Sequence, residues 1–244
     1  IQNRFLCKIR ELPENKLLFI MSFVVGVGSG LAAVLLKHSI HFVAGLLTSW
    51  FNTPAESILY ILYPGLGMLL SLLFVKYLIK DNIGHGVTKV LTAVSKNDSR
   101  IKPHNMWSSV FSSSLTIGFG GSVGAEAPIV YTGAAIGSNV ARWMGLSPKH
   151  MTILLGCGAA GAVAGIFKAP LAGILFTLEI LLFNISMTSI LPLLVSAVTA
   201  TTISYLFLGD KVVFANSILP FSMGNIPFYV ALGIVCGFIS LYFI

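Results

Sequence analysis

One carboxylate, Glu126, stands in a segment with almost no other charge, GGSVGAEAPIVYTGAAIGSNVAR at residues 120–142. The glycines before it allow an irregular backbone, and Pro128 suits the first turn of a helix, where its missing N–H costs nothing. The chain is therefore predicted to break and to restart as a helix at about 126–128. A helix N-terminus binds anions through its unpaired N–H groups and its positive dipole end. The carboxylate would compete there with a mobile anion, unless it only caps the helix or reaches to an interface.

The energetic cost of a charge in a membrane predicts that more than one helix end is involved. A charge at the bilayer centre costs at least ~2.5–3.5 kcal/mol, whereas one helix end returns about 0.3–1 kcal/mol, up to ~2 when partly buried. The segment IGHGVTKVL, residues 83–91, offers a second helix start, because Gly84 and Gly86 free the backbone before a helix expected at about 86–96. Broken helices that aim their N-termini at an anionic substrate recur in membrane transporters.

The composition places these segments in a membrane. Hydrophobic residues make up 56% of the 244 residues and charged residues 9%, against about 25% charged in soluble domains. Since no segment alternates as a barrel strand does, the predicted class is all-α and polytopic. The region 107–141 is apolar but rich in glycine and serine, which favours short helices over one crossing. The expected spans are about 17–49 (tilted), 57–79, 151–183 with a break, 187–208 and 226–244.

Basic residues predict the orientation of the chain. They precede the first span and follow the second, while the linker TSWFNTPAES between the spans has none. The positive-inside rule then places the N-terminus and the segment 76–102 in the cytoplasm. The membrane itself is expected to be an inner or plasma membrane. Residues 1–16 are expected to form a cytoplasmic segment on the membrane surface. Because the positive charges flank spans instead of forming one patch, nucleic acid is not an expected partner.

Two other kinds of chemistry are considered. Residues Gly120 to Gly124 match the G-x-S-x-G nucleophile elbow, so an intramembrane serine hydrolase using Ser122 is a distant alternative. No strand is expected before this motif, and the only histidine that follows Ser122 in the sequence is His150. His38 and His41 share a helical face but have no acidic or cysteine partner nearby. We therefore expect no metal, no cofactor and no enzymatic activity.

Three segments together resemble the CLC family of chloride channels and proton-coupled anion exchangers. The segment 120–142 resembles its G-x-E-G-P filter, GHGVTKV at 84–90 resembles its G-S-G-I-P segment, and AGAVAGIFKAPLAGILFTLEI at 160–180 resembles its A-x-F-x-A-P-L-A-G-x-L-F-x-x-E-E stretch. They occur in family order. The resemblance implies an inverted repeat of broken and tilted helices, and a homodimer in the lipid bilayer with one anion pathway per subunit.

The resemblance also implies roles for individual residues. Glu126 corresponds to the gating glutamate, which occupies an anion site when ionised and swings out when protonated. Chloride or a similar small anion would be the ligand. The backbone around two motifs would line its site, at Gly84, His85, Gly86, Val87, Gly124, Ala125, Ala127 and Pro128.

Departures from the family pattern leave channel and exchanger open. His85 replaces a serine that holds the anion, and it can gain a positive charge near pH 6–7. The paired acids that end the third motif read Glu179-Ile180. Isoleucine cannot carry a proton, which favours a voltage-gated-type chloride channel, although some exchangers also lack this acid. Glu179 remains a candidate for a proton path in the alternative, a proton/anion exchanger.

The organisation expected is a first transmembrane repeat with the filter loops over 17–208, then a loop and the first helix of a truncated second repeat over 209–244. No counterpart of the second half's filter loop is present. Glycines four residues apart, Gly133 with Gly137 and Gly161 with Gly165, predict close helix packing, and small residues after 156 suit a dimer contact. Lys168 is expected to be a loop or snorkelling lysine that could assist the anion electrostatically.

Overall fold

A computed structural model describes residues 14–50, 57–81, 86–180, 187–209 and 222–243. Helices are the only regular elements in these ranges, which confirms the all-α class. The chain divides into two units, Ile1–Val213 and Phe214–Ile244. Five of the described helices are long and apolar enough to cross a membrane: Lys16–Leu47, Leu62–Ile79, Pro148–Phe167, Ser189–Leu208 and Met223–Tyr242. The predicted surface segment 1–16 lies mostly outside the described residues.

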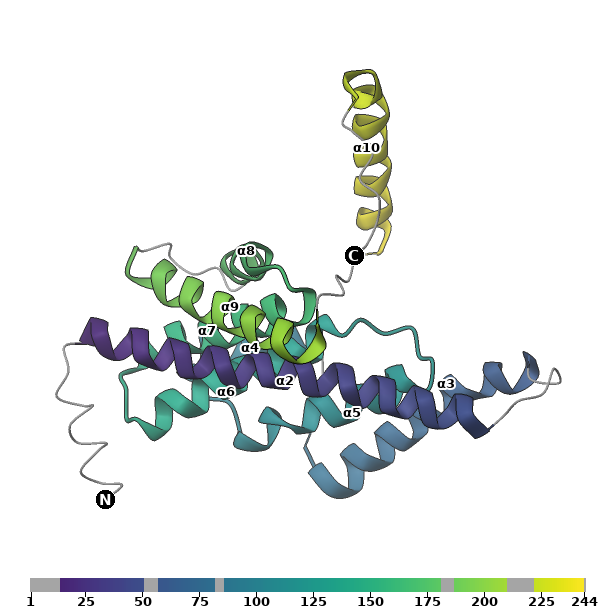
Figure 1. Cartoon of the computed structure of the whole chain (residues 1–244), viewed down its shortest axis with the longest axis horizontal. Coiled ribbons are helices and arrows are strands. Elements are labelled where there is room, and N and C mark those ends of the chain that lie inside the picture. The colour runs from purple at the N-terminus through teal and green to yellow at the C-terminus, as the bar shows by residue number, and fades with distance from the viewer. Residues whose placement is uncertain (1–13, 51–56, 82–85, 181–186, 210–221, 244) are drawn as a thin grey trace. The chain divides into compact units, whose positions relative to one another are not determined.

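Figure 1 shows the helices, coloured from purple to yellow in the order of the chain. The first unit contains α2 (Glu14–Trp50), α3 (Ser57–Leu73), the π-helix η2 (Phe74–Ile79), α4 (Gly86–Lys96), the 3-10 helix η3 (Pro103–Met106), α5 (Ser108–Gly118), α6 (Glu126–Trp143), α7 (Pro148–Phe167), α8 (Pro170–Ile180) and α9 (Met187–Leu208). The second unit contains η4 (Met223–Asn225) and α10 (Ile226–Phe243). The predicted helix at 86–96 is confirmed as α4.

The helix α7 forms the centre of the first unit. It packs against α6, α9, α2 and α8, and its residues 153–166 are all buried. The close packing predicted from the glycines is confirmed: a Cβ atom on Gly133 would collide with the carbonyl oxygen of Gly158, and one on Gly137 with that of Leu154. The small residues of α7, which were expected to suit a dimer contact, thus pack against other helices of the same chain.

The predicted break before α6 is also confirmed. The helix α5 ends at Gly118, and Gly120 has a φ of +85°, which favours glycine. The Gly121 N–H donates to the Thr116 carbonyl oxygen at 2.9 Å, so the chain turns back on the last turn of α5. The next helix begins at Glu126. The turn therefore brings the start of α6 next to α5.

A second break, between α7 and α8, is fixed by Lys168. This residue ends α7 in the left-handed conformation, with a φ of 56°, and Pro170 begins α8. The Lys168 Nζ donates to the Gly209 carbonyl oxygen and lies 4.8 Å from the ring centroid of Tyr205. Lys168 lies in a loop as expected, but it is only 7% exposed. It therefore ties this turn to the end of α9 and does not snorkel.

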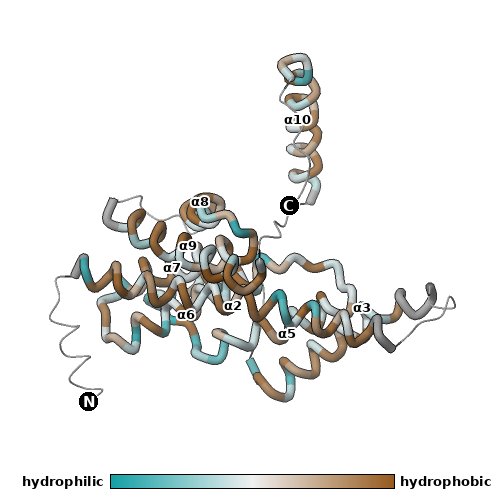
Figure 2. Tube along the Cα trace, in the orientation of Figure 1, coloured by the Kyte–Doolittle hydropathy of each residue, from teal (hydrophilic) through white to brown (hydrophobic). Residues whose placement is uncertain are grey.

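Apolar side chains remain exposed on several helices. On α3, Leu62, Leu66, Leu69 and Leu72 are all exposed, and Figure 2 shows hydrophobic residues along α2, α3 and α10. Large exposed apolar surfaces are uncommon on soluble monomers and suit contact with lipid. The structure thus agrees with a membrane-integral protein.

Candidate functional site

The helices α4 and α6 begin next to one another. Gly86 is the first residue of α4, and it is buried. A Cβ atom there would collide with the carbonyl oxygen of Ala127, in the first turn of α6, and would lie 3.1 Å from the Cβ of Tyr131. Only a glycine allows this approach, which brings together the two helix starts that the sequence predicted to converge.

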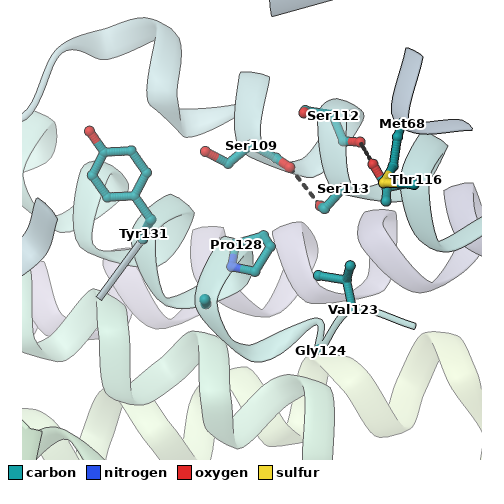
Figure 3. Close-up of a pocket in the computed structure, with 11 residues that line it drawn as sticks. Met68, Ser109, Ser112, Ser113, Thr116, Val123, Gly124, Pro128 and Tyr131 are labelled. Carbon is teal, nitrogen blue, oxygen red and sulfur yellow. Dashed lines mark hydrogen bonds between the residues drawn. The ribbon is translucent and has the colours of Figure 1, made fainter. Parts of the chain in front are cut away.

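A cavity of about 460 Å³ opens at this junction (Figure 3). Four of the predicted anion-binding residues line it, one from α4 and three from the segment around the start of α6. Val87 and Ala125 are half-buried and are not among the lining residues, and Gly84 and His85 lie outside the described residues. The lining residues are Met68, Gly86, Ser109, Ser112, Ser113, Thr116, Val123, Gly124, Ala127, Pro128 and Tyr131.

Hydroxyl groups of α5 form one wall of this cavity, which the sequence analysis missed. Ser109, Ser112, Ser113 and Thr116 lie at helical spacing on α5 and line the cavity together with Val123, Gly124 and Pro128 (Figure 3). The repeat of three and four residues was the signal that could have identified this face. Serines in an apolar segment also indicate short helices, so their spacing alone does not identify a cavity wall.

Most of these hydroxyls are already hydrogen-bonded. Ser113 Oγ donates to the Ser109 carbonyl oxygen at 2.6 Å, and Thr116 Oγ1 donates to the Ser112 carbonyl oxygen at 3.3 Å (Figure 3). Ser112 Oγ lies 2.7 Å from the Ser71 Oγ of α3. The buried Ser109 Oγ has no partner within the described part of the chain. The wall is therefore polar, but most of its hydroxyl groups already have hydrogen-bond partners within the protein.

Glu126 is the first residue of α6. Its side chain is exposed, and its Oε2 atom occupies the space that a Cβ on Gly124 would need. Glu126 does not itself line the cavity, but its neighbours Gly124 and Ala127 do. The carboxylate thus lies at the positive end of the α6 dipole. Its residue is the sequence neighbour of Ala127, which lines the cavity.

Other candidate residues lie apart from the cavity. Glu179 is exposed near the end of α8 and is not a lining residue. Ser122 is exposed, and the helix α5 precedes it where a nucleophile elbow requires a strand. His150 pairs through Nδ1 with Ser147 Oγ at 2.9 Å. The described residues therefore lack the context that the serine hydrolase alternative needs.

The histidine pair of α2 gives no sign of a metal site. His38 Nδ1 lies 3.2 Å from the carbonyl oxygen of Val34 in its own helix. Across the part of the chain that the structure describes, no three His, Cys, Asp or Glu residues gather as metal ligands.

Comparisons with known proteins identify the family of the chain. A family model described as "Voltage gated chloride channel" matches residues 66–244. The chain is 33% identical over 182 residues to "Putative chloride channel protein ClcB-like" of Ralstonia nicotianae, a match that covers 72% of this chain and 42% of that protein. It is 29% identical over 197 residues to "H(+)/Cl(-) exchange transporter ClcA" of Vibrio vulnificus, which covers 75% and 41%.

The structure is also similar to the crystal structure of a CLC-type fluoride/proton antiporter. The TM-score is 0.74 at 27% sequence identity, over 93% of this chain and 57% of that one. The chain spans about two fifths of the length of the curated relatives it matches. Because the family model covers most of the chain, the resemblance inferred from the three motifs is confirmed, and the chain belongs to the voltage gated chloride channel (CLC) family.

Proposed function

We propose that this protein is a proton-coupled exchanger of chloride or a similar small anion, and that the anion occupies the cavity where α4 and α6 begin. The observation that carries the proposal is the meeting of two helix N-termini at one cavity. The backbone of Gly86 would face the anion from the start of α4, and the backbone of Gly124 and Ala127 would face it from the start of α6, where Pro128 also lines the cavity. The adjoining Val87 and Ala125, together with Gly84 and His85, would complete the set. Backbone N–H groups bind a small anion without needing a cation.

Glu126 would act as the gate. At the first residue of α6 its ionised carboxylate can take the place of an anion, because the same N–H groups and dipole attract both. Protonation removes the charge and with it this attraction, so the side chain leaves and the anion enters. Each exchange of carboxylate for anion thus brings one proton onto the protein, which links the two movements.

The choice between exchanger and channel rests on observations that point in opposite directions. The matched relative from Vibrio is named an H(+)/Cl(-) exchange transporter and the matched structure a fluoride/proton antiporter; both favour the exchanger. Ile180, at the position of the second acid, favours the channel that the sequence analysis preferred. In an exchanger Glu179, the remaining acid of that motif, would be the inner candidate for the proton path.

A flux experiment separates the two. The full-length protein is reconstituted in liposomes with equal chloride on both sides and a pH gradient across the membrane. An exchanger drives chloride uphill and shifts the reversal potential with the pH gradient, whereas a channel does neither. Chloride movement without uphill transport would establish the channel, and no anion movement at all would end the proposal.

We further propose that the protein lies in the plasma (inner) membrane with its N-terminus in the cytoplasm, and that it forms a homodimer. The distribution of basic residues supports the orientation. The dimer is supported by the family resemblance alone, since the small residues of α7 are buried within the chain.

A further inference from the structure

A groove of about 340 Å³ lies between α5 and the continuous segment of α3 and η2. Met68, Ser112 and Thr116 line both this groove and the cavity at the helix starts (Figure 3). The two spaces therefore share a wall, but they have different further lining residues. We call the new space the α3–α5 groove.

The hydroxyl groups of the α3–α5 groove already have partners. Ser71 Oγ lies 2.7 Å from Ser112 Oγ, a bond that joins α3 to α5. Thr116 Oγ1 donates to the Ser112 carbonyl oxygen at 3.3 Å. The remaining neutral side chains of the described lining are apolar: Met68, Leu72 and Val75. A hydrated ion would lose water here without gaining hydrogen bonds in return, so the interior suits a hydrocarbon chain.

Lys76 supplies the charge of the α3–α5 groove. Along α3 and η2 the lining runs from Met68 to Lys76, so the ammonium group lies at one end of the apolar wall. The Lys76 side chain is exposed, and none of the lining residues that the structure describes is acidic. A cation at the end of an apolar groove is complementary to a molecule with an anionic head and a hydrocarbon tail.

The surroundings of Lys76 place it at the level of the lipid headgroups. The membrane-spanning segment Leu62–Ile79 ends shortly after it. Tyr77 and Trp107 are both exposed, and the Trp107 ring lies 6.4 Å from that of Phe74 in η2. Exposed tyrosine and tryptophan side chains gather at the interface between membrane and water. A lysine there can bury its stem in the hydrocarbon and extend its charge to a phosphate.

The size of the groove and its side of the membrane narrow the class of ligand. Its volume of about 340 Å³ is in the lower part of the ~300–1,000 Å³ range of pockets for organic ligands, which leaves room for a segment of one acyl chain. The proposed orientation places residue 76 on the cytoplasmic side. The cytoplasmic leaflet is the one that carries anionic phospholipids.

We propose that the α3–α5 groove is a binding site for an anionic phospholipid of the cytoplasmic leaflet, with the phosphate at Lys76 and one acyl chain against Leu72 and Val75. The choice of leaflet rests on the proposed orientation, whereas the site itself does not depend on transport. The acyl chain would fill the outer side of the wall that the groove shares with the anion cavity. A ligand that binds only the folded state stabilises it, so the lipid would hold α3 and α5 together.

Photo-crosslinking tests the site directly. Full-length protein in phosphatidylcholine vesicles is mixed with phosphatidylglycerol that carries a diazirine on one acyl chain, and the labelled peptides are identified by mass spectrometry. Labelling is expected in the segments 68–76 and 112–116. Unlabelled phosphatidylglycerol is expected to compete with this labelling, and extra phosphatidylcholine is not.

Two pairs of variants separate the head from the tail of the lipid. Lys76→Gln is expected to lower labelling of these segments about fivefold, the effect of one lysine near an anionic surface. Lys80→Gln is its matched control, because Lys80 is exposed at the end of η2 and does not line the groove. Leu72→Ala is expected to lower labelling as well, and Leu69→Ala, an exposed leucine of α3 outside the lining, is not.

Thermal unfolding in detergent gives a second readout. Phosphatidylglycerol is expected to raise the melting temperature of wild type and of Lys80→Gln, but not that of Lys76→Gln. Equal loss of labelling in the two lysine variants would reduce the effect to general surface charge. Equal competition by phosphatidylcholine would reduce the lipid to an ordinary boundary lipid. No label in either segment would show that another part of the protein or a second copy covers the groove. Each of these three results would overturn the inference.

Discussion

At the residue scale, the role of Glu126 depends on its place at the start of α6. The carboxylate lies over Gly124 at the positive end of the helix dipole, next to residues that line the cavity. A permanent charge here would hold an anion site closed. Because protonation is what would open the site, the charge state of one side chain should control both flux and its pH dependence.

Glu126→Gln imitates the protonated gate. Anion flux is expected to stay at least equal to wild type, and pH-dependent gating is expected to disappear, because glutamine has no proton to release. Chloride flux in liposomes between pH 4 and pH 8 measures both effects. Asp98→Asn is the matched control for loss of a carboxylate, because Asp98 is exposed after α4 and does not line the cavity; it should keep the pH dependence of gating. Wild-type pH dependence in Glu126→Gln would remove Glu126 from its proposed role.

At the scale of elements, the site depends on how closely its helices pack. The α6–α7 contact positions the helix whose first turn forms the cavity wall. It is built from backbone against backbone, with Gly137 next to Leu154 and Gly133 next to Gly158. Because backbone atoms form this contact, no side chain can change its rotamer to make room, and any added volume must move one of the helices.

Gly137→Ala is expected to destabilise the protein by about 1–3 kcal/mol, because its Cβ would meet the backbone of Leu154 and Leu155. Gly45→Ala, in α2, is the matched control: a Cβ there meets nothing within 4 Å. This control is expected to be neutral or stabilising by about 0.5–1 kcal/mol, since alanine restricts the unfolded chain more than glycine does. Thermal unfolding in detergent compares them, and equal melting temperatures would show that the α6–α7 contact is looser than described.

The connection from α4 to α5, which carries Arg100 and Lys102, is held to α6 by Ser138. Its Oγ accepts from the Ile101 N–H at 3.0 Å and donates to the Ser99 carbonyl oxygen at 2.6 Å. Ser138 is buried, so water cannot replace either bond.

Ser138→Ala is therefore expected to cost about 1–3 kcal/mol, the penalty of leaving buried polar groups unpaired. Thr202→Ala removes an exposed hydroxyl that bonds only within its own helix α9, and it should change the melting temperature little. If both variants unfold at the same temperature, the connection is not held by Ser138.

At the scale of the whole molecule, function requires that the connection from α4 to α5, which carries Arg100 and Lys102, face one side of the membrane. The positive-inside rule assigns that side to the cytoplasm.

Cysteine labelling tests this orientation. Asn97→Cys lies at an exposed position after α4 and is expected to react with a membrane-impermeant maleimide only when the cytoplasmic side is open. Thr53→Cys, in the linker without basic residues, is expected to react in intact cells. Each variant needs the parent protein as background, because Cys236 is exposed. The reverse pattern would invert the proposed orientation.

Taken alone, the sequence determined the all-α membrane class, the helix at 86–96, the restart at Glu126 and the family. These features follow from local causes: hydropathy over about 20 residues, glycines that free the backbone, and a proline that suits a first helical turn. The same residues would give the same local result in many folds. The role of His85, which follows from the family resemblance, stays a prediction because His85 lies outside the described residues.

Only the tertiary structure decided which of these elements meet. Gly86 touches Ala127 across about forty residues of chain, the serines of α5 become a cavity wall, and Lys89 joins Arg100 and Lys102 around Asp81. The cost of a charge in the membrane predicted that the two helix starts converge, but no local pattern predicts which residues touch, because the contacts depend on how α4, α5 and α6 pack together. Lys168 is the clearest example. Its sequence context predicted a loop or snorkelling lysine; it lies in a loop, but packing against Tyr205 and the end of α9 buries it.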